Sequence, residues 1–197
     1  MRGDMATNTE SVDLVGDEAA TNLARAALFA ALVGAFAYVS FPFPVSPAPV
    51  TLQVLGVFLA GILLGPVWGG AALVLYLAAG ALGAPVFSGG AAGLGELVGA
   101  TGGYLWSYPI AAALVGAIVH RGAGLRDLDA VSAPVLVGAM VAGTVVVYAL
   151  GVVGLFLTLE LTLVESVVQG AVVFLPAEGA KMAAAVGIVR SDAIAAE

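Results

Sequence analysis

The sequence predicts an all-α integral membrane protein with six transmembrane helices and both termini in the cytoplasm. Of its 197 residues, 61% are hydrophobic and only 10% are charged, whereas a soluble domain carries about 25% charged residues. Six apolar stretches are long enough, or nearly long enough, to cross a bilayer. The arginines gather in the segments that these stretches place on one side of the membrane.

The six predicted spans, in chain order, are residues 23–41, 50–64, 67–82, 104–119, 130–159 and 166–189. The second and third are short, so we expect them to tilt or to continue into the Gly65-Pro66 turn between them. Pro176 suits the first turn of a helix, where its missing N–H costs nothing. The last helix proper is therefore predicted to begin near Pro176, with residues 161–175 forming a separate interfacial or re-entrant segment.

The two ends of the chain are predicted to lie outside this domain of residues 23–190. Five of the thirteen acidic residues fall in the first eighteen positions, which have no apolar periodicity. Residues 1–22 are thus expected to be a disordered acidic cytoplasmic tail, and residues 191–197 a C-terminal tail. The acidic excess, with a single lysine, points towards a halophilic prokaryote such as an archaeon, with the protein in its plasma membrane.

The orientation follows from the positive charges. Six spans leave both termini on one side, which carries all the arginines: Arg2, Arg25, Arg121, Arg126 and Arg190. The loops on the other side carry neither Lys nor Arg, so the arginine side is expected to face the cytoplasm. Outside lie the proline-rich stretch 42–49 and the glycine-rich loop 83–103. We expect loop 83–103 to be a lid whose backbone amides face a small molecule; the alternative is a flexible connector.

Two charges fall inside the last predicted span. Glu178 and Lys181 are three residues apart, so they share one helical face and can partly neutralise each other. Each costs about 2.5–3.5 kcal/mol in a membrane, which makes them candidate functional residues. The alternative is a structural ion pair, although apolar residues would replace such a pair at little loss of stability.

Several functions are excluded by the composition. With one histidine and no cysteine, the usual metal sites cannot be built, and no phosphate-binding Gly-Lys-Ser/Thr loop occurs. We therefore expect no enzyme, no metal and no cofactor. A net charge of −7 without a basic patch excludes nucleic acid as a partner. A binder or carrier of a small solute fits best, with a solute channel or a structural membrane protein as alternatives.

Four segments together resemble the BioY family, the biotin-binding substrate-specific (S) components of energy-coupling-factor (ECF) transporters. They are PVTLQVLGVFLAG at residues 49–61, GAPVFSGG at 83–90, TGGYL at 101–105 and FLPAEGAK at 174–181. The resemblance covers residues 23–190. It implies a six-helix bundle that binds biotin with high affinity, near the outer face, beneath the loop between the third and fourth spans. It also implies a transmembrane coupling protein and ATPase subunits as partners, although a stand-alone biotin carrier remains an alternative.

With biotin as the expected ligand, its chemistry suggests roles for particular residues, which we state as a hypothesis. Glu178 would accept from the ureido N–H groups of biotin, and Lys181 would donate to the ureido carbonyl or pair with the valerate. The remaining candidates would add hydrogen bonds or apolar walls: Gln53, Gly89, Gly90, Phe87 and Tyr104. The family commonly has Asp at position 178 and Pro at position 100, where this chain has Glu178 and Ala100. Because the Glu178 side chain is longer, the alternative that the chain is an S component for another small vitamin stays open.

A partner surface is expected on the first span. In related S components the coupling protein packs on small residues of this helix. Ala26/Ala30 and Ala27/Ala31 have the four-residue spacing that lets helices approach closely. The alternative is that these alanines pack within the bundle itself.

Overall fold

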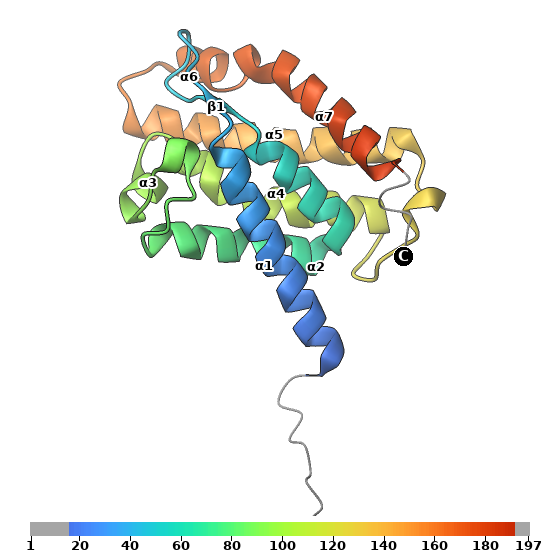
Figure 1. Cartoon of the computed structure of the whole chain (residues 1–197). Coiled ribbons are helices and arrows are strands. Elements are labelled where there is room, and N and C mark those ends of the chain that lie inside the picture. The colour runs from blue at the N-terminus through green and yellow to red at the C-terminus, as the bar shows by residue number, and fades with distance from the viewer. Residues whose placement is uncertain (1–15, 192–197) are drawn as a thin grey trace, which may run out of the picture.

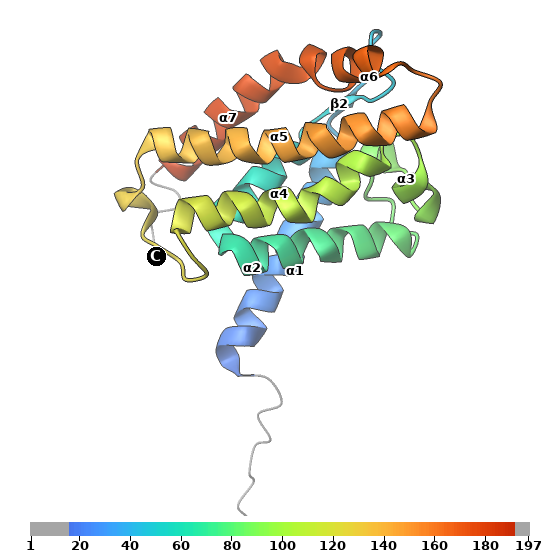
Figure 2. The same ribbon diagram turned by 180° about the vertical axis from the view of Figure 1, so that it is seen from behind.

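The computed structural model describes residues 16–191, which form a bundle of helices with one short hairpin (Figures 1 and 2). The elements, with η for 3₁₀ helices, are α1 (Asp17–Ala37), β1 (Ser40–Phe41), β2 (Val50–Thr51), α2 (Gln53–Ala81), η1 (Ser88–Gly90), α3 (Leu94–Val98), α4 (Gly102–His120), η2 (Leu128–Ala130), α5 (Ala133–Thr158), α6 (Leu163–Gly170), η3 (Val172–Phe174) and α7 (Leu175–Val189). Within the described residues, five stretches are long and apolar enough to cross a membrane: α1, α2, α4, α5 and residues 163–189. The predicted all-α membrane fold is confirmed.

The second and third predicted spans form one bent element, α2. Gly65 interrupts its helical backbone with φ 74° and ψ −176°, a conformation that residues with a side chain rarely adopt. Pro66 follows and restarts the helix, so the two arms of α2 diverge from the bend (Figure 1). The predicted turn at Gly65-Pro66 is confirmed, and it explains why five long stretches replace six.

The bend in α2 is held from α4. Because Pro66 has no N–H, it cannot bond the carbonyl of Ile62 four residues earlier. His120 supplies the missing donor, with its Nε2 2.9 Å from the Ile62 oxygen. Its Nδ1 accepts the backbone N–H of Arg126 at 3.0 Å, so Nδ1 carries no proton and the imidazole donates through Nε2. His120 thereby joins the bend, the end of α4 and the following loop.

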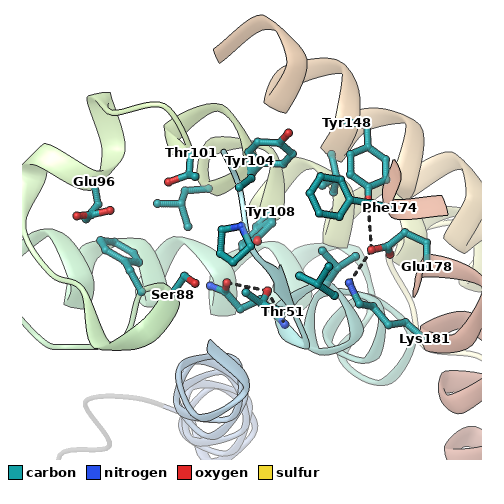
Figure 3. A pocket seen from close by; sticks show the side chains of 18 residues that line it. Thr51, Ser88, Glu96, Thr101, Tyr104, Tyr108, Tyr148, Phe174, Glu178 and Lys181 are labelled. Atoms are coloured by element: carbon teal, nitrogen blue, oxygen red, sulfur yellow. Dashed lines mark hydrogen bonds and ion pairs between the residues drawn. The ribbon is translucent and has the colours of Figure 1, made fainter. Parts of the chain in front are cut away.

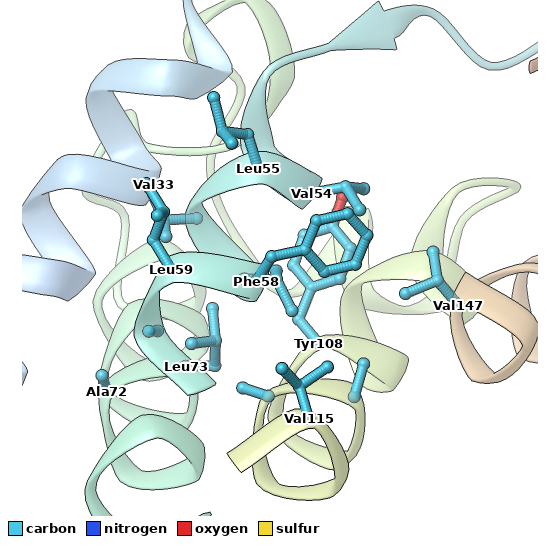
Figure 4. Close-up of a cluster of buried hydrophobic side chains, with 14 of the residues drawn as sticks. Val33, Val54, Leu55, Phe58, Leu59, Ala72, Leu73, Tyr108, Val115 and Val147 are labelled. Carbon is cyan, nitrogen blue, oxygen red and sulfur yellow. The ribbon is translucent and has the colours of Figure 1, made fainter. Parts of the chain in front are cut away.

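The helices pack closely around α4, which contacts α2 on one side and α5 on the other, while α1 covers α2 (Figure 2). Where α4 crosses α5, a Cβ added at Gly154 would lie 3.0 Å from the backbone nitrogen of Gly103. Val33, Phe58 and Val115 are fully buried in the core (Figure 4). Small residues and interlocking side chains of this kind stabilise helix contacts in lipid, where van der Waals packing replaces the hydrophobic effect.

The element ends differ from the prediction chiefly at the N-terminus. α1 begins at Asp17, so residues 17–22 of the predicted acidic tail are helical; residues 1–15, including Arg2, and 192–197 lie outside the described residues. The predicted break in the last span is confirmed: α6 ends at Gly170, η3 follows, and α7 starts at Leu175 with Pro176 in its first turn.

The bundle has two chemically different ends. At one end lie the start of α1, the α2 bend, loop 121–132 and the end of α7 (Figure 1). Arg190 ties that loop to α7 by donating to the carbonyls of Leu128, at 3.1 Å, and Val131. At the other end, β1 pairs with β2 in register Ser40↔Thr51, beside η1 and α3. The described arginines thus fall at the first end, and a cavity opens at the second.

Candidate substrate-binding site

The cavity lies between the hairpin, the start of α2, loop 82–101, and helices α4, α5 and α7 (Figure 3). The empty space between its lining side chains, together with the open solvent at its mouth, amounts to about 600 Å³. Aromatic and aliphatic side chains form most of the wall, and a few polar groups converge on it. This composition is typical of a pocket that buries a small, mostly apolar ligand.

The two predicted intramembrane charges meet in this wall. α7 starts at Leu175, which places Glu178 in its first turn and Lys181 one turn later on the same face. The Lys181 Nζ lies 2.6 Å from the Glu178 Oε1, and the side chains are only 7% and 2% exposed. The positive N-terminal end of α7 also favours a carboxylate at this place. The result is a charge-assisted contact protected from water.

One oxygen of Glu178 takes all the donors that reach it. Besides Lys181, the hydroxyl of Tyr148 on α5 donates to Oε1 at 2.9 Å (Figure 3). The other oxygen, Oε2, is buried and has no hydrogen-bond partner among residues 16–191. A buried acceptor without a donor is costly, about 1–3 kcal/mol or more for a charged group. Oε2 is therefore ready to accept from a ligand.

Gln53 anchors the opposite wall of the cavity through a chain of hydrogen bonds. Its Oε1 accepts from the Thr51 hydroxyl at 3.0 Å, and its Nε2 donates to the Tyr76 hydroxyl at 2.5 Å. Tyr76 in turn donates to the carbonyl of Val86 at 3.1 Å. This chain fixes the start of α2 to the loop after α2, and it leaves one N–H of the Gln53 amide for a ligand.

Aromatic side chains from different helices complete the pocket. Tyr148 stacks on Phe174, with centroids 6.0 Å apart and planes at 9°, and meets Tyr104 edge-on at 6.3 Å. Tyr104 donates to the carbonyl of Gly170 at 2.7 Å, which fixes the end of α6 to α4. Phe87 packs edge-on against Tyr76 at 5.5 Å. Rings held in this way give the cavity rigid apolar walls.

The structure brings together most of the predicted ligand contacts. Five of them line the same cavity: Gln53, Phe87, Tyr104, Glu178 and Lys181. Gly89 and Gly90 are not in its wall, where their neighbour Ser88 stands instead. Both adopt positive φ, 67° and 85°, and the Gly90 amide donates to the Phe87 carbonyl at 2.9 Å. The two glycines therefore shape the turn that presents Phe87 and Ser88.

The predicted partner residues on α1 point in two directions. Ala26 and Ala30 are buried, 1% and 8% exposed, on the side of α1 that packs on α2. Ala27 and Ala31 are exposed on its other side. The first pair thus packs within the bundle, and the second remains the candidate surface for another helix.

Sequence reasoning missed several wall residues. They are Thr51, Ser88, Glu96, Thr101, Tyr108, Tyr148 and Phe174. Tyr108 could have been found, because it lies four residues after Tyr104 and so shares its helical face. Tyr148 sits in an otherwise apolar span, and a buried tyrosine hydroxyl there needs a partner. Which partner it finds depends on how α5 lies against α7, and local sequence does not specify that.

Comparison with known proteins agrees with this architecture. The family model described as "BioY family" matches residues 5–196. The chain belongs to the BioY family. It is 41% identical over 140 residues to the biotin transporter BioY of Rhodobacter capsulatus, covering 69% of this chain and 70% of that one. It is 37% identical over 130 residues to the biotin transporter BioY of Thermotoga maritima, covering 66% and 71%.

A solved structure extends the agreement to three dimensions. The chain is similar to the crystal structure of the S-component for biotin from an ECF-type ABC transporter, with a TM-score of 0.80 and 25% sequence identity. The match covers 90% of this chain and 93% of the chain in that crystal structure. The family resemblance and the S-component fold predicted from the sequence are both confirmed. This BioY-family member is a membrane protein, and its named relatives are transporters.

Proposed function

We propose that the chain is a high-affinity, substrate-specific subunit for biotin uptake across the plasma membrane. The observation that carries the proposal is the buried Glu178 carboxylate in the cavity wall, with Oε1 taken by Lys181 and Tyr148 and Oε2 without a donor among residues 16–191. Biotin has two ureido N–H donors beside a carbonyl acceptor on an apolar bicycle. Relatives named as biotin transporters support the same substrate.

Biotin would bind with its ureido ring towards α7. Glu178 Oε2 would accept a hydrogen bond from a ureido N–H. The Lys181 ammonium has three N–H groups and uses one for Glu178, so another would donate to the ureido carbonyl. A valerate in that place would meet the Glu178 carboxylate, and like charges repel. The apolar ring would lie among Tyr104, Tyr148 and Phe174, and the valerate would extend towards Ser88 at the mouth.

The cavity would open to the outside of the cell. The described arginines, Arg25, Arg121, Arg126 and Arg190, lie at the opposite end of the bundle, which the positive-inside rule assigns to the cytoplasm. The loop of residues 82–101 would cover the bound ligand. In the lipid bilayer, Ala27 and Ala31 would offer a close-packing surface to the transmembrane coupling protein that works with the ATPase subunits.

Calorimetric titration of the purified protein in detergent tests the substrate. We expect stoichiometric, tight binding of biotin, weaker binding of desthiobiotin, and no binding of riboflavin or pantothenate. Glu178→Gln should weaken biotin binding by at least about tenfold, because a charged acceptor becomes a neutral amide. Glu160→Gln, which changes an exposed acid, is the matched control and should bind like the wild type. A folded protein that does not bind biotin would overturn the proposal and favour another vitamin as the substrate.

Uptake of labelled biotin tests the partnership. The chain is expressed in cells without biotin transport of their own, with and without the coupling protein and ATPase subunits. We expect efficient uptake only with these partners, and Ala27→Leu should reduce it without changing biotin binding. Equal uptake by the chain alone would identify a stand-alone carrier.

A further inference from the structure

Tyr148 donates a hydrogen bond to Glu178, in addition to the ion pair that Glu178 forms with Lys181. Its hydroxyl donates to the Oε1 of Glu178 at 2.9 Å, the same oxygen that Lys181 approaches at 2.6 Å. A carboxylate has no proton to give, so the tyrosine must be the donor. Two donors from different helices, α5 and α7, therefore converge on one oxygen, and Oε2 is left without a donor among residues 16–191.

The Tyr148 ring is itself held in place. It stacks on Phe174 at 6.0 Å and meets Tyr104 edge-on at 6.3 Å, and the residue is 9% exposed. Tyr104 is fixed in turn by its bond to the Gly170 carbonyl. The direction of the Tyr148 hydroxyl is thus set by α4, α6 and η3 together, before any ligand enters.

Without Tyr148, the carboxylate would have another arrangement open to it. An ammonium next to a free carboxylate can be shared by both oxygens after a turn about the last side-chain bond, which is a soft torsion. In that arrangement neither oxygen is left free for a ligand. A second donor on Oε1 stabilises the orientation in which Lys181 and Tyr148 share one oxygen and Oε2 remains open.

We propose that Tyr148 is a positioning residue for substrate selectivity. It holds the Glu178 carboxylate so that Oε2 meets an N–H of the ligand, which restricts the site to cyclic ureas whose nitrogen facing Oε2 is unsubstituted. This inference rests on the proposed biotin function. It assigns Tyr148 no contact with the ureido group; its effect passes through Glu178.

Selectivity between biotin and its two mono-N-methyl ureido analogues tests this role. Tyr148→Phe removes one oxygen atom and keeps the ring stack on Phe174. We expect the Kd for biotin to rise about tenfold, near the lower end of the contribution of one hydrogen bond to a charged group. The methylated analogue that wild-type protein rejects most strongly has no N–H for Oε2, so its Kd should stay the same or fall. The ratio of the two Kd values should shrink about tenfold.

Thr144→Val is the matched control, because it also removes one buried hydroxyl hydrogen bond of α5, the one to the Met140 carbonyl at 2.9 Å, at a residue that does not line the cavity. It should change the binding of both ligands by the same factor and leave the ratio at the wild-type value. In a Glu178→Gln background, Tyr148→Phe should change the ratio no further. An unchanged ratio in Tyr148→Phe, or an equal fall in Thr144→Val, would overturn the positioning role while the biotin function stands. Wild-type protein that binds neither ligand would overturn both.

Discussion

Replacing Lys181 by methionine is expected to lower both the stability of the protein and its affinity for the ligand. A second substitution, at Glu178, is expected to separate the two effects. Methionine keeps most of the length and apolar character of the lysine stem and removes the charge. In the wild type, Lys181 and Glu178 are 7% and 2% exposed and 2.6 Å apart. The variant therefore leaves a carboxylate buried with Tyr148 as its remaining donor.

The structure sets the size of both effects. Breaking a buried pair by removing one partner costs about 3–5 kcal/mol of stability, far more than the loss of an exposed pair, about 0–1 kcal/mol. In binding, truncation of one partner of a buried charge pair costs about 2–5 kcal/mol. Since about 1.4 kcal/mol is a factor of ten, the Kd for biotin should rise about thirtyfold or more.

The double variant Glu178→Gln with Lys181→Met completes the assay. It leaves no unpaired charge, so the midpoint of thermal unfolding in detergent should return close to the wild-type value. Binding of biotin should stay lost in calorimetry, because the ligand needs the charged acceptor and the ammonium donor. A double variant that binds biotin like the wild type would show that Glu178 and Lys181 form a structural pair without a role in binding.

Other predictions concern the mouth and the packing. Glu96 lines the mouth, at the far end of the cavity from Lys181 (Figure 3). Glu96→Gln should lower the Kd for biotin about threefold in low salt, because it removes like-charge repulsion with the valerate. An unchanged Kd would place the valerate elsewhere. Gly103→Ala should destabilise the α4–α5 crossing by about 1–3 kcal/mol in thermal unfolding. Gly138→Ala is the control and should not destabilise the protein, because the added Cβ meets no atom within 4 Å. Equal unfolding midpoints in the two variants would contradict the close packing at Gly103. His120→Ala should leave the Ile62 carbonyl unpaired, which lowers the free energy of unfolding by about 1–3 kcal/mol, and the Kd for biotin should not change. A loss of affinity would contradict a role confined to the bend.

The features predicted from the sequence are those with a local physical cause. Gly65-Pro66 predicts the bend because glycine permits positive φ and proline restarts a helix. Pro176 predicts the start of α7 for the same reason. The spacing of Glu178 and Lys181 places them on one face, and their cost in a membrane marks them as exceptional. Each of these inferences needs no more than one turn of helix.

The features missed depend on contacts between distant segments. The hydroxyl of Tyr148 reaches Glu178 across 30 positions of the chain, and its choice of partner follows from how α5 and α7 pack. The same is true of His120 and Ile62, which are 58 positions apart. α1 begins six residues before the predicted span, because its first turn carries Asp17 and Glu18, and acidic side chains are favourable at a helix N-terminus.

A structure of the protein with biotin bound tests the proposed binding site and the orientation of the ligand in it. We expect the ureido ring beside α7, with one ureido nitrogen at hydrogen-bonding distance from Glu178 Oε2, the ureido oxygen facing Lys181, and the valerate towards Ser88 and Glu96. A valerate paired with Lys181, or biotin bound outside this cavity, would contradict this expectation.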